Sequence, residues 1–492
     1  MDLAELSKIV EEIRIDTLAE VSSIDFAELE KHGIYKGTSG WSINYPGTLY
    51  LDKFSKNYDL SIPDEISNLF ISLPFCSRRC TFCTIISDSS PVGREEYFKA
   101  LFKEMRFYKK SPKTKVKYID LGGGTASLLT PNELDSLLTV VKDCFELEDN
   151  PHICLEAHPE LIHQQNRTDL LSVARKHKIP NIAFGVQTFD DQLLSKFNRG
   201  HGVEDVKKAV SFAKKYIPSF SFDLIVGIDG QDMESVGKTI CETLLQNPGS
   251  IDLYTYVNSH LSLNNSSDNK RSFIMTLFFL NSFTRLGWYP HRISADVIVF
   301  KKSRDMNSIK SALEGLGSFG HLNLLGVGSG AFSFLKDFHA VNPYDINKYI
   351  SNVESNNVGF SLYYKKDAKD LFYNYVKDSL RRHCTLDISK ISKIFAFDFV
   401  RHYRRIIGKL VSLGLITYDE DKMLLRLTKL GFIYSDKVIS FFFPTKYFED
   451  YFALEKKVNN SHLKEFHEEI CNSPFNFELT PEIHSFIRKQ RS

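Results

Sequence analysis

Three cysteines lie close together in one short stretch of the chain. Cys76, Cys80 and Cys83 form a C-x3-C-x2-C pattern directly after an apolar run. Thiolates are soft ligands that hold zinc or iron–sulfur clusters, and a loop with this spacing can wrap three sulfur atoms around one metal centre. Three ligands leave one position unfilled. A zinc site would then need a distant fourth ligand, whereas a [4Fe-4S] cluster would keep one iron open to a substrate or cofactor.

The other cysteines carry no comparable signal. The chain has eight in total, and those outside the stretch are scattered singly, with no second C-x2-C pair. In a reducing compartment such thiols are usually plain buried or surface residues. We therefore expect one metal centre rather than two. The scattered residues are Cys144, Cys154, Cys241, Cys384 and Cys471.

The cysteine stretch belongs to a region in which short apolar strands alternate with amphipathic helical segments. This alternation begins near Asn68 and is typical of a parallel sheet built from βα units. Helices are expected at 95–108 and 131–144, and around Leu170, Val206 and Val236. The expected strands are 69–73, 117–121, 153–157, 182–186, 220–226 and 253–257. Strands in this order predict an α/β fold, a partial (β/α)6 TIM-like barrel.

The residues that could do chemistry fall at one end of these strands. Cys76 follows the first strand, and Gly122 follows the second. Glu156 closes the third strand, Gln187 follows the fourth and Asp223 lies in the fifth. Barrel enzymes carry their active sites at the carboxyl ends of the strands. The sequence therefore predicts a site at this rim.

The regions on either side of the barrel differ from it in sequence pattern. Residues 1–65 read as an N-terminal extension that opens with a helix, and 66–340 as the barrel. Residues 341–447 contain helical segments and a hairpin at 415–428, which predicts a winged-helix-like module, and 448–492 form a C-terminal tail. Winged helices often bind DNA. Lys and Arg number 62 against 61 Asp and Glu, so we expect packing or substrate covering instead, and no nucleic-acid partner.

Composition sets the remaining limits. Hydrophobic residues make up 42% and charged residues 25% of the 492 residues, which predicts a globular protein with a sizeable core. The start of the chain carries acidic residues and no long apolar run, so no secretory signal is expected. The richest apolar stretch, 273–283, is too short and interrupted to span a bilayer. We expect a cytoplasmic protein.

Taken together and in order, the motifs resemble those of radical S-adenosylmethionine (SAM) enzymes. The resemblance covers about 66–445 and is closer to the oxygen-independent coproporphyrinogen III oxidase-like branch, which also includes haem chaperones and class C radical SAM methyltransferases. Beside the cysteine pattern, the motifs are Gly122-Gly-Gly-Thr125, Phe184-Gly-Val-Gln187, Asn198-Arg199, Phe222-Asp223-Leu-Ile-Val-Gly227 and Leu325-Gly-Val-Gly-Ser-Gly-Ala331.

The resemblance implies two cofactors. The three thiolates would hold a [4Fe-4S] cluster, whose open iron chelates SAM. An electron from a reductase or flavodoxin-type donor would then cleave SAM to methionine and a 5′-deoxyadenosyl radical. The resemblance does not identify the catalytic side chains. The implied cofactor-binding residues are Phe70, Phe82, Gly123, Gly124, Thr125, Glu156, Gln187, Arg199, Asp223, Val257 and Phe332.

The substrate does not follow from the resemblance. Phe70 and Ser72 stand where the porphyrinogen oxidases usually have Tyr and His, and Thr84 stands in place of an extra Cys. The stretch around His321 lacks the Tyr-Trp pair of the haem chaperones. A catalytic role and haem ligation are the functional readings of His321, but a lone His is more often structural. Our leading hypothesis is an enzyme that oxidises or methylates a bulky organic molecule, such as a tetrapyrrole or natural product. A haem chaperone with a structural or electron-transfer cluster is the alternative, and a zinc-binding structural protein is a third.

Overall fold

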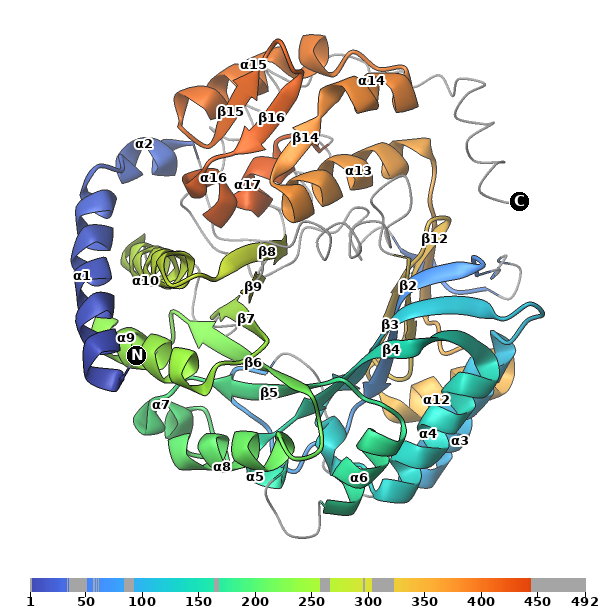
Figure 1. Cartoon of the computed structure of the whole chain (residues 1–492). Helices are drawn as coiled ribbons and strands as arrows, with labels where there is room; N and C mark the ends of the chain where they lie inside the picture. Colours follow the sequence, from blue (N-terminus) through green and yellow to red (C-terminus); the bar gives the residue numbers. More distant parts are fainter. Residues whose placement is uncertain are drawn as a thin grey trace.

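The computed structural model describes residues 2–32, 34, 51–55, 58, 60, 62–83, 93–162, 168–256, 266–294, 297–302 and 323–443. Its main feature is a 13-stranded mixed sheet that curves into an arc (Figure 1). The centre of this sheet is parallel and runs in the order β10-β2-β3-β4-β5-β6-β7. These strands are β2 (Glu65–Leu73), β3 (Thr114–Gly123), β4 (Phe145–Ala157), β5 (Asn181–Gln187), β6 (Ser219–Val226), β7 (Ser250–Thr255) and β10 (Leu324–Val327).

The six consecutive strands expected from the sequence are β2 to β7, and the prediction of a mostly parallel α/β sheet is confirmed. The addition is β10, which pairs in parallel with β2 although Leu324 and its partner Asn68 are far apart in the chain. Antiparallel strands extend both ends of the arc. They are β9 (Val297–Lys301) and β8 (Tyr289–Ser294) beyond β7, and β11 (Phe332–Phe334), β12 (Phe338–Val341), β13 (Leu362–Lys365) and β1 (Asp52–Lys53) beyond β10.

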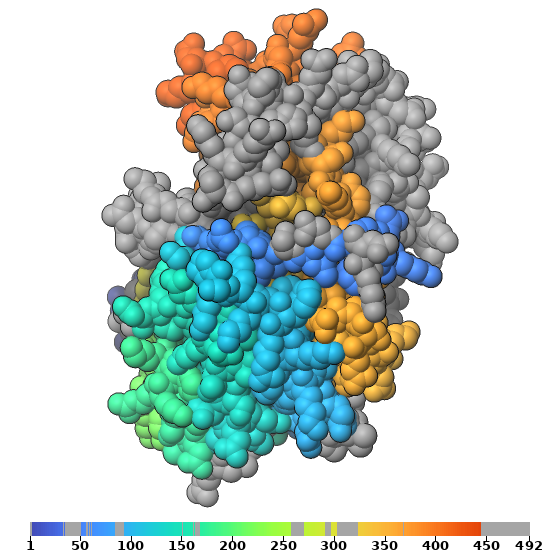
Figure 2. All heavy atoms as spheres, turned by 90° about the vertical axis from the view of Figure 1, so that its right-hand side faces the viewer, coloured from blue at the N-terminus to red at the C-terminus, as the bar shows by residue number. Residues whose placement is uncertain are grey.

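Amphipathic helices cover the outer face of the arc. In α4, the Thr130 side chain and Glu133 form a capping box and Pro131 occupies the first turn, so local sequence fixes where this helix begins. Figure 2 shows α3, α4 and α12 side by side on this face. The helices are α3 (Arg94–Phe107), η2 (Ala126–Leu128), α4 (Pro131–Cys144), α5 (Pro159–Ile162), α6 (Thr168–Lys176), α7 (Asp191–Lys196), α8 (Val203–Ala213), α9 (Met233–Gln246), α10 (Ser266–Arg285) and α12 (Ile346–Asn356).

The amino-terminal region contributes α1 (Leu3–Ser22) and α2 (Phe26–Lys31). Helix α1 packs against α9 and α10, and it buries the apolar side chains that the sequence placed at helical spacing, including Leu6, Val10 and Ile13. Asn281 of α10 donates to Thr17 Oγ1 at 3.0 Å. The described part of the extension is thus joined to the barrel by a buried apolar face.

Replacing Ile13 by alanine should lower the free energy of unfolding by about 2–5 kcal/mol, because the side chain is buried and its removal leaves a cavity between α1 and its neighbours. Ile15 is on the same helix and 56% exposed, so Ile15→Ala is the matched control and should change stability by less than about 0.5 kcal/mol. Denaturant unfolding compares the two. Equal losses would contradict the packing of α1 described above.

The carboxy-terminal elements form a small unit of their own. A three-stranded sheet in the order β14-β16-β15 packs with surrounding helices, and β15 and β16 are the hairpin expected at 415–428. Helix α13 contacts β8 at the far end of the main sheet (Figure 1). The elements are α13 (Ala368–His383), β14 (Thr385–Asp387), α14 (Ile388–Phe395), α15 (Phe399–Ser412), β15 (Ile416–Asp419), β16 (Leu424–Leu427), α16 (Lys429–Ile433) and α17 (Ser435–Ser440).

The division of the chain into the four predicted regions remains a prediction. The tail at 448–492 lies outside the described residues. Among the helices that the structure does describe, none combines the length and apolar character needed to cross a membrane.

Candidate functional site

The cysteine loop leaves the carboxyl end of β2 and is fastened at once to the glycine turn that follows β3. Gly124 N donates to Leu73 O at 3.0 Å, and Thr125 N donates to Phe75 O at 2.8 Å. A Cβ on Gly124 would lie 2.6 Å from Leu73 O, so no other residue fits this close approach. The Thr125 hydroxyl lies 3.5 Å from Cys76 Sγ. The glycine run therefore fixes the start of the loop.

The three cysteines of the loop are half-buried at this rim. Cys83 N donates to Cys80 O at 3.2 Å, which closes a tight turn between the last two. Within the described ranges, no three His, Cys, Asp or Glu side chains are gathered as ligands of a single metal ion. The assignment of Cys76, Cys80 and Cys83 as cluster ligands thus remains a prediction from their spacing.

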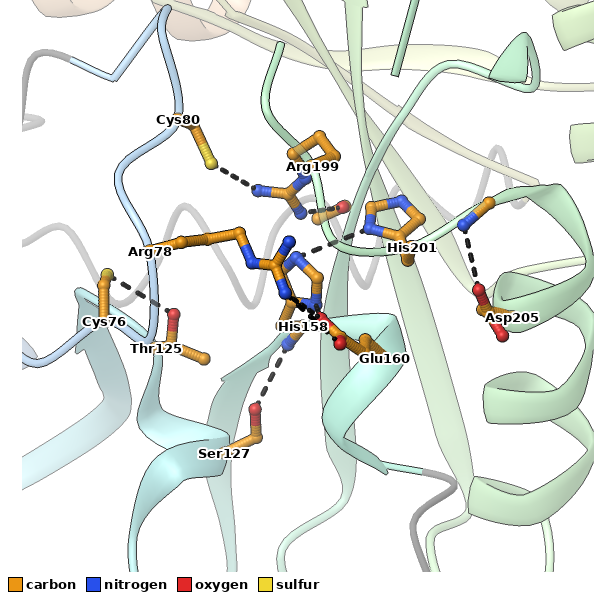
Figure 3. A network of polar contacts seen from close by, with 12 residues as sticks. Cys76, Arg78, Cys80, Thr125, Ser127, His158, Glu160, Arg199, His201 and Asp205 are labelled. Atoms are coloured by element: carbon orange, nitrogen blue, oxygen red, sulfur yellow. Dashed lines mark hydrogen bonds and ion pairs between the residues drawn. The ribbon is translucent and has the colours of Figure 1, made fainter. Parts of the chain in front are cut away.

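Arg199 reaches the loop from the segment after α7. Its Nη1 donates to Cys80 Sγ at 3.2 Å, and its Nη2 donates to Gly185 O at 2.5 Å (Figure 3). The Nε atom is buried and has no acceptor among the described residues. One guanidinium thus connects the loop to the end of β5, and its Nε–H is still available as a donor.

Two acidic residues named from the sequence, Glu156 on β4 and Asp223 on β6, lie near the cysteine loop in the parallel part of the sheet. Glu156 Oε2 accepts from Gly123 N at 3.3 Å, and Gly122 has no side chain because a Cβ there would overlap the Glu156 carboxyl group. Burial raises the pKa of Glu156 to about 7, and the negative charge of Asp120 adds to the shift. Burial also raises the pKa of Asp223, helped by Asp252, its register partner on β7.

Gln187 ends β5 with a positive φ of 70° and is 7% exposed. A Cβ on Gly185 would lie 2.9 Å from Gln187 Nε2 and 3.1 Å from Arg199 Nη2. The bare backbone at Gly185 therefore allows the amide and the guanidinium to lie close together beside β5.

The aromatic residues named from the sequence are placed less uniformly. The Phe82 ring meets Phe197 edge-on at 4.8 Å, and the Arg199 guanidinium lies 6.0 Å from its centroid. Phe70 is half-buried on β2 beside Asp120. Phe332 is 45% exposed at the start of β11. Val257, like His321 and Thr84, lies outside the described residues.

Sequence reasoning did not name four residues that belong to this rim. Asp120 accepts from Asn68 Nδ2 at 2.6 Å, and Asp252 pairs in register with Asp223. His158 and His201 lie beside Arg199 (Figure 3). Asp120 lies on β3, two residues before Gly122. His158 lies just beyond β4, two residues after Glu156. The alternation of side chains along a strand was the signal that could have found the two aspartates.

The raised pKa of Glu156 predicts a pH dependence of stability. A carboxyl group whose pKa is higher in the folded than in the unfolded protein stabilises below the unfolded value and loses that contribution as the pH rises. Stability should therefore fall between about pH 4.5 and 7, by at most about 3 kcal/mol from this group. Glu156→Gln should flatten that slope in denaturant unfolding, whereas the exposed control Glu96→Gln should retain it.

Comparison with known proteins identifies the class. Residues 70–240 match the model of the Radical SAM superfamily, so this part of the chain is a radical SAM domain. Members of this superfamily use a [4Fe-4S] cluster and S-adenosylmethionine. The likeness in fold extends further than this domain: coproporphyrinogen III oxidase (HemN) from Escherichia coli superposes with a TM-score of 0.68 over 85% of this chain and 98% of its own, at 21% identity.

The relatives fall into two groups with different names. The heme chaperone HemW of Haemophilus influenzae is 29% identical over 195 residues, which are 38% of this chain and 50% of that protein. The chain thus aligns with half the length of this relative. The oxygen-independent coproporphyrinogen III oxidase of Helicobacter pylori strain 26695 is 23% identical over 401 residues, 77% of this chain and 86% of that protein.

The residues at the rim fit the two cofactors. The glycine turn leaves backbone exposed where side chains would block approach, and the buried Arg199 Nε has no acceptor in the part of the chain that the structure describes. Glu156 and Asp223 are acceptors for hydroxyl or ammonium groups, and Cys76, Cys80 and Cys83 are of the ligand type that holds iron–sulfur clusters. Nothing in this donor set conflicts with a cluster next to SAM.

Proposed function

We propose that the protein is a radical SAM enzyme that oxidises, methylates or otherwise alkylates a bulky organic molecule. The observation that carries the proposal is the position of Arg199, which joins the cysteine loop at Cys80 to the strand end that also presents Gln187. When bound, the cluster supplies the electron that cleaves SAM to methionine and a 5′-deoxyadenosyl radical.

Each part of the rim then has a task. Cys76, Cys80 and Cys83 would hold the cluster. Arg199 would donate its remaining N–H groups to the SAM carboxylate, as a guanidinium does well. Glu156 and Asp223 would accept hydrogen bonds from the ammonium group and the ribose hydroxyls. Phe82 would pack near the adenine, and the bare backbone of Gly123 and Gly124 would let SAM approach closely.

The rest of the assignment comes from the sequence. The bulky organic substrate would lie between the barrel and the carboxy-terminal elements, and a reductase or flavodoxin-type protein would supply electrons in the cytoplasm. The contact of α13 with β8 supports this placement, because it brings the carboxy-terminal elements to the open side of the arc.

The test is anaerobic reconstitution with iron and sulfide, followed by reduction with dithionite in the presence of SAM. We expect about four irons and four sulfides per chain and release of 5′-deoxyadenosine. A full cluster without any 5′-deoxyadenosine would refute the enzyme proposal. One zinc per chain and no sulfide would favour the structural zinc site instead.

A haem chaperone is the second candidate, and the 29% identity to HemW favours it. A haem chaperone should bind haem, and it should not turn over SAM in response to a substrate. Titration with haem followed by absorption spectroscopy decides the matter: a saturable haem band supports the chaperone, and its absence removes this candidate.

A further inference from the structure

Two side chains fasten the segment 199–201 to the end of β5. Arg199 Nη2 donates to Gly185 O, and His201 Nε2 lies 3.3 Å from the next carbonyl, Val186 O (Figure 3). A carbonyl oxygen only accepts, so His201 carries its proton on Nε2. The two bonds act on neighbouring carbonyls of one strand, and they fix the backbone from which the Arg199 side chain reaches Cys80.

A second histidine supports the first. His158, which follows β4, lies 4.9 Å from the His201 ring in an edge-on contact, and its Nε2 is 3.4 Å from His201 Nδ1. Since His201 Nδ1 carries no proton, His158 Nε2 must donate to it. The His158 backbone N in turn donates to Ser127 Oγ at 3.1 Å. A chain of hydrogen bonds therefore runs from the end of β4 to the end of β5.

An ion pair closes the other side of this arrangement. Arg78 lies inside the cysteine loop, and its Nη2 is 3.3 Å from Glu160 Oε2 on α5. The pair packs directly over Gly200, where a Cβ would overlap both side chains. The cysteine loop and the segment carrying Arg199 are thus held against each other through residue 200.

We propose that His158 and His201 are positioning residues which, with the Arg78–Glu160 pair, hold the Arg199 guanidinium as a hydrogen-bond donor to Cys80 and so raise the reduction potential of the cluster bound there. The inference rests on the proposed function, because it needs the cluster. Reduction adds negative charge to the cluster, and a cationic donor to a ligand sulfur stabilises the reduced form.

The histidines are suited to this task because they are uncharged. Burial, together with the positive charge of the nearby Arg199 guanidinium, lowers the pKa of His158 to about 2 and that of His201 to about 3. The histidines are 8% and 5% exposed, respectively. Neutral rings make directional hydrogen bonds without adding a third positive charge beside Arg78 and Arg199.

The test measures the midpoint potential of the reconstituted protein by EPR-monitored redox titration without SAM, so SAM binding by Arg199 does not enter. His201→Phe keeps the ring volume but loses both hydrogen bonds. We expect reduction to become roughly tenfold less favourable, a shift of about 59 mV to more negative potential for one electron. His201→Gln keeps a donor and an acceptor and should restore most of the shift. The control is His177→Gln, a buried histidine bonded to Asp135 at 2.6 Å, which should leave the potential unchanged.

A second variant covers a folding failure of the first. Gly200→Ala pushes the Arg78–Glu160 pair away from the segment without touching the histidines, and it should shift the potential in the same direction. Either variant, loaded with a full cluster and showing the wild-type potential, overturns the inference while leaving the enzyme proposal intact. Wild-type protein that forms no iron–sulfur cluster overturns both.

Discussion

Alanine in place of Cys80 is expected to abolish cluster binding. After anaerobic reconstitution the variant should hold little iron or sulfide, and 5′-deoxyadenosine release should fall by more than about 100-fold, because loss of a ligand costs more than the 10–100-fold typical of an outer hydrogen-bond partner. Cys76→Ala and Cys83→Ala should behave alike, since a cluster held by three thiolates has no spare ligand. Iron and sulfide analysis and product chromatography provide the measurement.

The matched control for this experiment is Cys144→Ala. Cys144 is a buried thiol at the end of α4 and, like Cys80, forms no disulfide with any cysteine that the structure describes. The Cys144→Ala variant should lose some stability because of the small cavity, but it should keep its full iron content. Full cluster loading in Cys80→Ala, or equal iron loss in Cys144→Ala, would contradict the assignment of the three rim cysteines.

Glu104→Ala is expected to have the largest effect on stability. Glu104 is a fully buried residue of α3, and its carboxyl group accepts from Gly328 N at 2.9 Å, Gly359 N at 2.8 Å and Tyr349 OH at 2.7 Å. Alanine would leave three buried donors unpaired, at about 1–3 kcal/mol each before water or rearrangement compensates. We expect a loss of about 3–5 kcal/mol in denaturant unfolding.

Two observations separate this effect from a general response to mutation. Glu96→Ala, at an exposed site of the same helix, should change stability by less than about 0.5 kcal/mol.

Burial raises the pKa of Glu104, so the contribution of this group to the free energy of unfolding is fully present below about pH 4.5 and declines as the pH rises. The difference between wild type and Glu104→Ala should therefore be larger at pH 5 than at pH 8. A difference that grows with pH would contradict this account.

The local parts of the fold could be predicted from the sequence, because they leave local patterns. The alternation of apolar strands and amphipathic helices predicted β2 to β7 in order, and the helix expected at 131–144 has the bounds of α4. The pairing of β10 with β2 left no such pattern. Its four residues, Leu324–Val327, include a glycine and no alternation, and its partner lies more than 250 residues earlier.

The site divides in the same way. Glu156, Gln187, Arg199 and Asp223 could be named because the resemblance assigned a role to each motif position. Glu104 could not be named, because an acid on an amphipathic helix is usually solvated, and the groups that enclose it, such as Gly328 after β10 and Tyr349 of α12, are distant in the chain. His158 and His201 look like ordinary single histidines until the strand ends bring them together.

The position of β10 has a consequence for how the molecule is assembled during synthesis. Until residues 324–327 emerge from the ribosome, β2 is paired with β3 alone. Its other edge then has unpaired backbone N–H and C=O groups that can pair with a strand of another chain. Contacts this distant in the chain form slowly and leave the intermediate prone to aggregation. We therefore expect the region 70–240, which matches the superfamily model, to be prone to aggregation when it is expressed without β10. The strand that carries the cysteine loop becomes an inner strand only late, when the last parallel strand arrives.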